Sequence, residues 1–155
     1  MKLTLVFGLG ACLAQPVSAF ARQDASKDVQ ELLVTLKSEK VPERAAAARI
    51  LGEMGPAAKE AVPALQEALA DSDKEVRRSA ARSLGDIGRP AKPAVPALGK
   101  ALKDPDATVR QAAAYALGRI GDPAGKPFLE AAKKDTNENV KRAAKDALKA
   151  LKKQG

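Results

Sequence analysis

The side chains that most often carry out chemistry in proteins are scarce in this sequence. Its 155 residues contain no histidine, no tryptophan, one cysteine and one tyrosine. Without histidine there is no Ser–His or Cys–His catalytic pair, and no imidazole to act as an acid, a base or a metal ligand near neutral pH. A single cysteine provides neither an internal disulfide nor a cysteine-rich metal site. The composition therefore predicts a non-enzymatic protein without a cofactor.

Carboxylates remain as candidate metal ligands, and they gather in two short segments. One contains Asp71, Asp73 and Glu75, and the other contains Asp104 and Asp106. A calcium loop would also need a glycine for its sharp turn and a distant bidentate glutamate, and neither segment provides them. We interpret these carboxylates as helix caps.

The elements that position these residues form an internal repeat. The pattern Gly-x-x-Gly ends at Gly55, Gly88 and Gly121, at intervals of 33 residues. A fourth copy, residues 140–151, is displaced by 31 residues, so its first half is two residues shorter. Before each glycine pair, apolar residues recur with the period of one helix face. In the third copy this stripe consists of Val109, Ala112, Ala113, Ala116, Leu117 and Ile120. We call these helices the B helices.

The first half of each repeat is also helical in its pattern. Residues 61–69 and 94–102 each carry a proline that must start or kink the helix, and residues 24–39 form a similar A helix without proline. A capping box at Ser72-x-x-Glu75 and the acidic residues of Asp104-Pro105 and Asp122-Pro123 predict helix starts. The repeat glycines suit helix ends, and no segment alternates with the period of a strand. The fold class is all-α.

Three residue types recur at fixed spacings across the repeats. A proline is followed eight residues later by an aspartate, and six further on by a basic residue. This pattern resembles the short HEAT repeats of phycobilisome-lyase-like proteins. The resemblance implies an α-solenoid of about four antiparallel helix pairs over residues 24–153, with units 24–55, 56–88, 89–121 and 122–153. The three sets are Pro63/Asp71/Arg77, Pro96/Asp104/Arg110 and Pro127/Asp135/Lys141.

The resemblance also implies a structural ladder. In such a ladder an aspartate caps a helix and pairs with the basic residue of its own or the next unit. The ladder residues here are Asp71, Arg77, Asp104, Arg110, Asp135 and Lys141. As exposed pairs they are expected to contribute about 0–1 kcal/mol each and mainly to set the register. The first unit departs from the pattern, because Ser38 stands at its aspartate position and Glu43 precedes Arg44.

One column of the B helices lies off the apolar stripe and holds Arg49, Arg82, Tyr115 and Asp146. The resemblance places this column on or near the concave surface of the solenoid. Tyr and Arg are enriched in protein-binding hot spots, so Arg49, Arg82 and Tyr115 are the partner-binding candidates. The alternative is that Tyr115 leans over its neighbours as part of the core.

The N-terminal residues have the pattern of a secretory signal peptide. Lys2 precedes an apolar stretch, residues 3–13, too short to span about 30 Å of hydrocarbon. Small residues after Pro16 fit cleavage after Ala19 or after Ala21. We expect residues 1–21 to be removed and the protein to be periplasmic or secreted, with no transmembrane span. Lipid attachment at Cys12 is the alternative.

The functional hypothesis is an exported repeat scaffold that binds a protein partner through its curved B-helix face. One alternative is a relative of a bilin lyase, and another is a module that binds an anionic or membrane surface. An iron-dependent hydroxylase of the same repeat class needs His-Glu ligands that this chain lacks. The net charge of +8 and a basic last unit favour an acidic surface, while the scarcity of stacking aromatics disfavours nucleic acid. The basic residues of that unit are Lys133, Lys134, Lys141, Arg142, Lys145, Lys149, Lys152 and Lys153.

Overall fold

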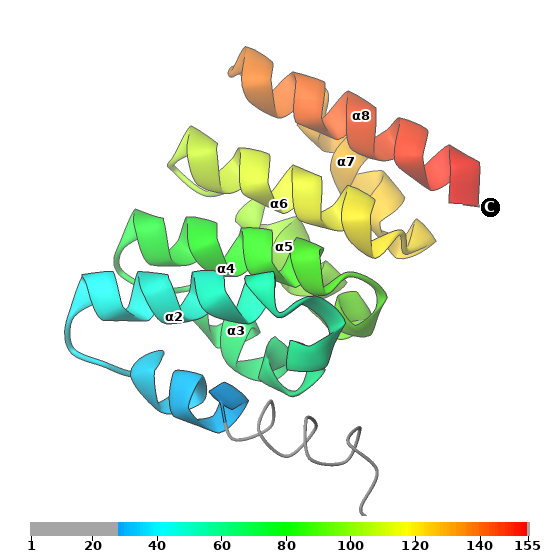
Figure 1. Ribbon diagram of the computed structural model, residues 1–155. Coiled ribbons are helices and arrows are strands. Elements are labelled where there is room, and N and C mark those ends of the chain that lie inside the picture. The colour runs from blue at the N-terminus through cyan, green and yellow to red at the C-terminus, as the bar shows by residue number, and fades with distance from the viewer. Residues whose placement is uncertain (1–27, 155) are drawn as a thin grey trace, which may run out of the picture.

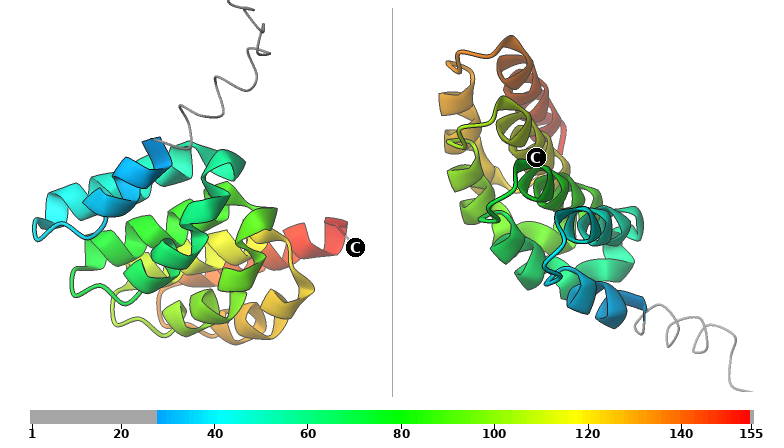
Figure 2. Two further views of the ribbon diagram at one scale, coloured as in Figure 1. Left: turned by 90° about the horizontal axis from the view of Figure 1, so that it is seen from below. Right: turned by 90° about the vertical axis from the view of Figure 1, so that its left-hand side faces the viewer.

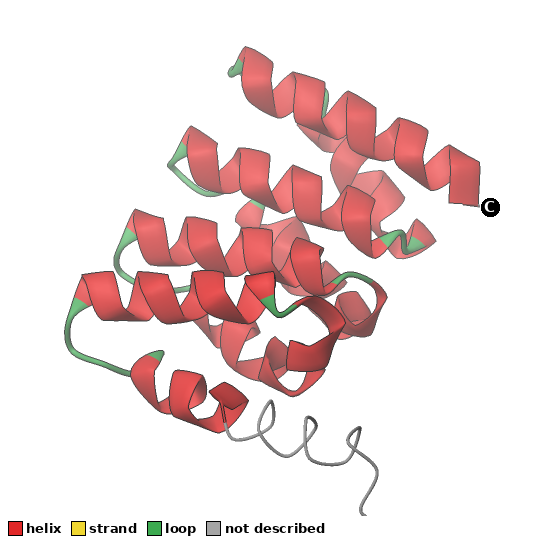
Figure 3. Cartoon of the chain, in the orientation of Figure 1, coloured by secondary structure: helices red, strands yellow, loops and turns green. Residues whose placement is uncertain are grey.

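The computed structural model describes residues 28–154, and this part of the chain is built from helices joined by short loops, without a strand (Figure 3). The all-α class is confirmed. The expected signal peptide, its cleavage sites and Cys12 lie outside the described residues.

The B helices form one layer in which each helix packs against the next (Figure 1). Their apolar stripes are rich in alanine, whose small side chain allows a close approach between helices. The helices in chain order are α2 (Val41–Glu53), α4 (Lys74–Ile87), α6 (Ala107–Ile120) and α8 (Glu138–Gln154).

Shorter A helices form the second layer. The first is residues 28–35, and it ends four residues before the predicted residue 39, since the chain turns there to enter α2. Each later A helix has its proline in the first turn, where no backbone N–H is needed, so the proline starts the helix and does not kink it. These helices are α3 (Val62–Ala68), α5 (Val95–Ala101) and α7 (Lys126–Ala132).

A 3₁₀ segment precedes each of these three A helices and adjusts its position. The segments η1 (Gly55–Ala61) and η2 (Arg89–Ala94) contain 7 and 6 residues, whereas η3 (Pro123–Gly125) contains 3. The shortening of the last repeat is therefore taken up in a linker, and α7 still packs against α8. The two layers follow a bent path, with the short helices on the outer side (Figure 2).

Two of the predicted helix starts are wrong by one or two residues. Asp73, and not Ser72, caps α4, since its carboxylate accepts a hydrogen bond from the backbone N–H of Glu75 at 2.8 Å. Asp106, and not Asp104, caps α6 by accepting one from Thr108 at 2.8 Å. In both turns the earlier aspartate is engaged elsewhere, as described below. The cap at Asp122 is confirmed.

The repeat glycines have two separate roles. A Cβ atom on Gly85 would lie 2.8 Å from the Cα atom of Ala116, and one on Gly118 would lie 2.7 Å from the Cβ atom of Ala147. These glycines thus let neighbouring B helices touch. Gly121 ends α6 in the left-handed conformation with φ of 74°, which a glycine adopts without strain.

Candidate partner-binding groove

The B-helix layer is hollowed along its open face. One groove of about 720 Å³ is lined by residues of α4, α6 and α8. A second hollow of about 410 Å³ is lined by residues of α2 and α4 and shares Arg78 and Arg82 with the first. We call the two together the B-face groove. It runs across all four B helices and has no lining residue from the A helices.

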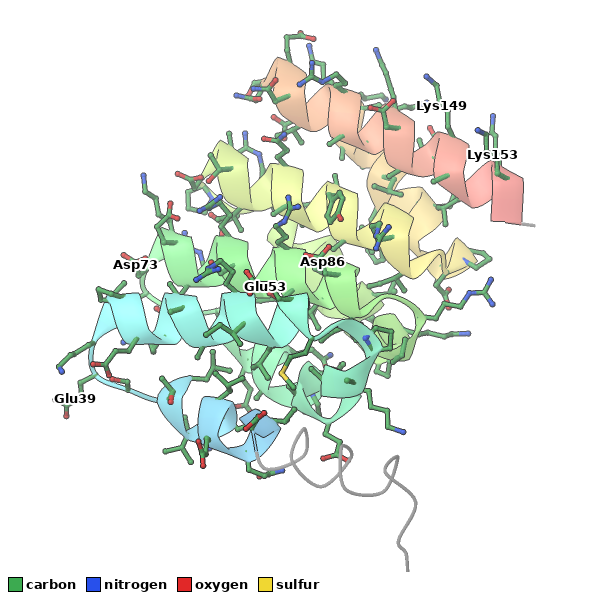
Figure 4. The ribbon with its side chains drawn as sticks, viewed as in Figure 1. Glu39, Glu53, Asp73, Asp86, Lys149 and Lys153 are labelled. Carbon is green, nitrogen blue, oxygen red and sulfur yellow. The ribbon has the colours of Figure 1, made fainter. Side chains whose placement is uncertain are left out.

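Side chains four residues apart on each helix line this groove, because such residues share one helix face. The predicted column supplies the middle position, and its neighbours one turn away supply the rest. The resulting rows are Arg49/Glu53, Arg78/Arg82/Asp86, Gln111/Tyr115/Arg119 and Arg142/Asp146/Ala150. Figure 4 shows Glu53 and Asp86 on this face.

Tyr115 joins two neighbouring helices at the middle of the groove. Its hydroxyl donates a hydrogen bond of 2.8 Å to a carboxylate oxygen of Asp86 on α4. The guanidinium carbon of Arg82 lies 5.0 Å from the ring centroid, a cation–π distance. Burial and the hydrogen bond to Asp86 both raise the pKa of Tyr115, so the phenol stays protonated and keeps donating. The half-buried tyrosine lines the groove and also leans on its neighbour, which combines the two interpretations of the sequence.

The groove carries more positive than negative charge. Five arginines line it, against three carboxylates, and no lysine does so. Arg49 pairs with Glu53 at 2.6 Å, whereas Arg82 lies 3.6 Å from Asp86. Within residues 28–154, neither Arg119 nor Arg142 forms an ion pair. The positive charge is therefore least compensated on α6 and α8.

A second set of arginines lies where a turn joins each A helix to the following B helix, which we call the turn edge. Arg77 donates from Nε and Nη2 to both carboxylate oxygens of Asp104, at 2.7 and 3.0 Å. Its remaining nitrogen, Nη1, donates to the backbone carbonyls of Asp71 and Ser72. The same bidentate arrangement joins Arg44 to Asp71 and Arg110 to Asp135. Each arginine thus pairs with the aspartate of the following unit.

These pairs are more buried than the sequence analysis expected. The side chains of Arg77 and Asp104 are only 14% and 8% exposed, because consecutive turns stack over them. Each aspartate also accepts a backbone N–H bond two residues on, as Asp104 does from Asp106. These are therefore not the exposed pairs to which the expected 0–1 kcal/mol applies, and removing one partner of such a buried, bidentate pair is expected to cost about 3 kcal/mol.

The ladder changes at both ends. At the first aspartate position, Ser38 donates to the carboxylate of Glu43 in its own unit. At the last arginine position, Lys141 does not continue the ladder, because no later turn among the described residues supplies an aspartate. Its Nζ instead lies 2.5 Å from a carboxylate oxygen of Glu138.

Sequence reasoning missed three of the groove residues. Arg78, Arg119 and Arg142 each lie four positions from a member of the predicted column. Extending the column by one turn in both directions would have found them. Only Arg142 was noted, as part of the basic last unit.

The lysines of the last unit lie outside the groove. Lys149 and Lys153 point away from the rest of the stack at the outer edge of α8 (Figure 4). Lys133 lies 2.5 Å from Glu130, and Lys149 lies 3.8 Å from Asp146. The basic last unit therefore presents most of its charge on the end of the solenoid and one arginine, Arg142, in the groove.

The sequence matches the family profile of HEAT repeats twice, over residues 29–94 and 91–149. The chain belongs to the HEAT-repeat family. The two matches include the three Pro–Asp–basic sets, so the resemblance inferred from those residues is confirmed. No curated protein sequence matches this HEAT-repeat chain.

Solved structures share the fold. Human deoxyhypusine hydroxylase with glycerol superimposes with a TM-score of 0.68 and 32% identity, covering 81% of this chain and 43% of that chain. The CpcE and CpcF complex of phycocyanin lyase from Nostoc sp. PCC7120 superimposes with a TM-score of 0.66 and 22% sequence identity, covering 87% of this chain and 92% of that chain. A designed armadillo repeat protein in complex with the peptide (KR)4 superimposes with a TM-score of 0.66 and 20% sequence identity, covering 84% of this chain and 69% of that chain. The last two likenesses establish the fold alone.

Residues 28–154 also bear on two other classes of site, a membrane span and a metal centre. None of the helices there has the length and apolar character needed to cross a membrane. Within the same residues, no three carboxylate or cysteine side chains gather where they could hold a metal ion.

Proposed function

We propose that this HEAT-repeat protein is a non-enzymatic scaffold that binds a protein partner in the B-face groove. The observation that carries the proposal is the groove itself, which crosses all four B helices and holds a central tyrosine among arginines. Repeat solenoids present such extended concave surfaces for binding, and Tyr and Arg dominate the energetics of protein interfaces. The designed armadillo protein holding a peptide is a relative in fold that supports the same use.

The construction of the groove supports rigid binding. The close contact between α6 and α8 at Gly118 and Ala147, which both line the groove, holds its floor. Its edge is held by the buried arginine–aspartate ladder. A partner would therefore bind a surface that is already formed, which lowers the entropy lost on association.

Affinity capture with a blocked groove tests this proposal. Gln111 lines the groove in the first half of α6, so Gln111→Trp should obstruct it and weaken capture of the partner by at least tenfold. Ala131→Trp is the matched control, because Ala131 is exposed on α7 in the outer layer and should leave capture unchanged. Equal capture by both variants would overturn the proposal.

We also propose that the protein is exported through its N-terminal segment. The support is the sequence pattern of residues 1–21, with one positive charge, a short apolar stretch and small residues. Mass spectrometry of the extracytoplasmic protein should find the new N-terminus at residue 20 or 22. An N-terminus at a lipid-modified Cys12 would establish the lipoprotein alternative.

A further inference from the structure

Arginine and lysine are divided between different surfaces of this solenoid. The described residues contain nine arginines, of which three form the ladder and five line the B-face groove. The many lysines lie outside that groove. A surface needed only for solubility has no reason to prefer one cation, whereas arginine offers a planar fork that matches a carboxylate or a phosphate. The division indicates recognition of an anionic group inside the groove.

Three of the groove arginines, on α4, α6 and α8, are available to a ligand. Arg119 is exposed and forms no ion pair among the described residues. Arg142 is also exposed, and its polar contact is a hydrogen bond of 3.3 Å to the Asn139 side chain. Arg82 is held over the Tyr115 ring with only a long contact to Asp86, so it too has donors to offer.

The shape and lining of the groove favour a peptide over other polyanions. Glu53, Asp86 and Asp146 lie among the arginines and would repel a continuous row of phosphates. Tyr115 is the one aromatic side chain among the residues that line the groove, and Arg82 lies over one face of its ring, so the groove has no row of aromatic rings on which successive bases could stack. A flat lipid surface cannot enter a hollow between helices. A peptide can place a carboxylate at one position and a neutral residue at the next.

The spacing of the helices sets the spacing of those carboxylates. Packed helices lie about 8–10 Å apart, and an extended chain advances about 3.3 Å per residue. A peptide that crosses the B helices at right angles thus meets a new helix about every three residues, which fits the step from Arg82 to Arg119. Arg119 lies one turn after Tyr115 of the column and Arg142 lies one turn before Asp146. These two arginines are therefore also offset by about 12 Å along the helices, and the step between them takes about four to five residues. Gln111 and Asn139 also line the groove and can bond to the peptide backbone between these points.

We propose that the B-face groove binds an extended acidic peptide segment, with carboxylates about three residues apart seated on Arg82 and Arg119 and a third carboxylate about four to five residues further on seated on Arg142. This inference rests on the proposed function and names the chemistry of its partner. It places the acidic partner in the groove and not on the lysine-rich end of the last unit.

Fluorescence anisotropy of the chain with a labelled nine-residue peptide tests this assignment. The probe has Glu at positions 1, 4 and 8 and Ser or Ala elsewhere, and its partner probe has Gln at those positions. Wild type should bind the Glu peptide at least tenfold more tightly than the Gln peptide. The variant Arg119→Gln/Arg142→Gln should reduce this preference to about threefold or less, because two of the three available forks are lost.

Lys145→Gln/Lys149→Gln is the matched control, since it removes the same charge from exposed positions of α8 outside the groove. It should change the affinity for the Glu peptide less than twofold. Arg119→Lys/Arg142→Lys keeps the charge and loses the fork, so it should bind at least threefold more weakly than wild type.

Three results would overturn the inference. The first is an equal loss of affinity for the Glu peptide in the arginine double variant and in the lysine double variant. The second is equal affinity of the wild type for the Glu and Gln peptides. The third is tighter binding of a single-stranded oligonucleotide or of phosphatidylserine vesicles than of the Glu peptide. If the peptide fails but Gln111→Trp still abolishes capture of a partner, the proposed function stands and only the acidic ligand is wrong.

Discussion

The turn edge and the B-face groove both use arginine, the first to hold the fold together and the second to present free donors. Arg77 at the edge satisfies its donors within the protein and is nearly enclosed by neighbouring turns. Arg82, five residues later on the same helix, has a side chain that is 64% exposed and only a long contact to a carboxylate. A shift of little more than one helical turn thus separates a structural arginine from one available to a ligand. The difference is burial and the number of partners, not residue type.

The largest effect should come from breaking the ladder. Arg77→Met keeps the length of the side chain but leaves Asp104 buried without its cation. The free energy of unfolding should fall by about 3 kcal/mol and the melting temperature by roughly 10 °C. Thermal and denaturant unfolding followed by circular dichroism measure both.

A double variant sharpens this result. Arg77→Met/Asp104→Asn should lose less free energy of unfolding than the sum of the losses of the two single variants, because no uncompensated charge is left. Strict additivity would show that the pair does not act as a unit.

The next effect concerns the contact between helices that forms the groove floor. Gly118→Ala brings a Cβ atom to 2.7 Å from that of Ala147, so α6 and α8 must separate. The free energy of unfolding should fall by about 1–2 kcal/mol, since overpacking outweighs the better helix propensity of alanine. Chemical denaturation measures this.

Gly99 provides the control for that substitution. A Cβ atom there would also be close, at 2.8 Å, but its neighbour is the ring of Phe128, which is 36% exposed and can rotate away. Gly99→Ala should be neutral or stabilising. A loss as large as that of Gly118→Ala would contradict the distinction between backbone and side-chain contact.

Acid should weaken the arginine–aspartate ladder. Burial opposes ionisation of Asp104, but hydrogen bonds from Arg77 and from the Asp106 backbone outweigh it and lower the pKa below its usual 3.8. A carboxyl with a lowered folded-state pKa stabilises the fold above its unfolded pKa and loses that contribution as pH falls through the folded value. The contribution of the Asp104 carboxylate to the free energy of unfolding should therefore be constant from about pH 5 to 8 and should decrease below about pH 4. Unfolding curves of wild type and Asp104→Asn across this range should converge in acid.

The smallest effect should come from the groove arginines. Arg82→Met and Arg119→Gln remove exposed side chains, so each should change the free energy of unfolding by less than about 0.5 kcal/mol. Denaturant midpoints measure this change. A cost comparable to that of Arg77→Met would mean that the groove arginines are structural too.

The repeating pattern of this sequence predicted the class of fold and the B-helix column. Alanine and leucine at helical spacing determine which face is buried, and the glycines Gly88 and Gly121, 33 residues apart, mark the ends of α4 and α6. These are local properties, which depend on neighbours within one or two helical turns. The same periodicity placed Arg49, Arg82 and Asp146 on the open face, where the structure has them exposed.

The tertiary structure alone decided which partners the charged residues take. Asp71 and Asp73 have the same side chain two residues apart, yet Asp71 receives Arg44 of the preceding unit and Asp73 caps α4. That choice depends on how one unit is rotated against the next, which spacing along the chain does not specify. The grouping of Arg82, Arg119 and Arg142 in one groove has the same origin, because three helices from separate repeats must stack before their side chains share a surface.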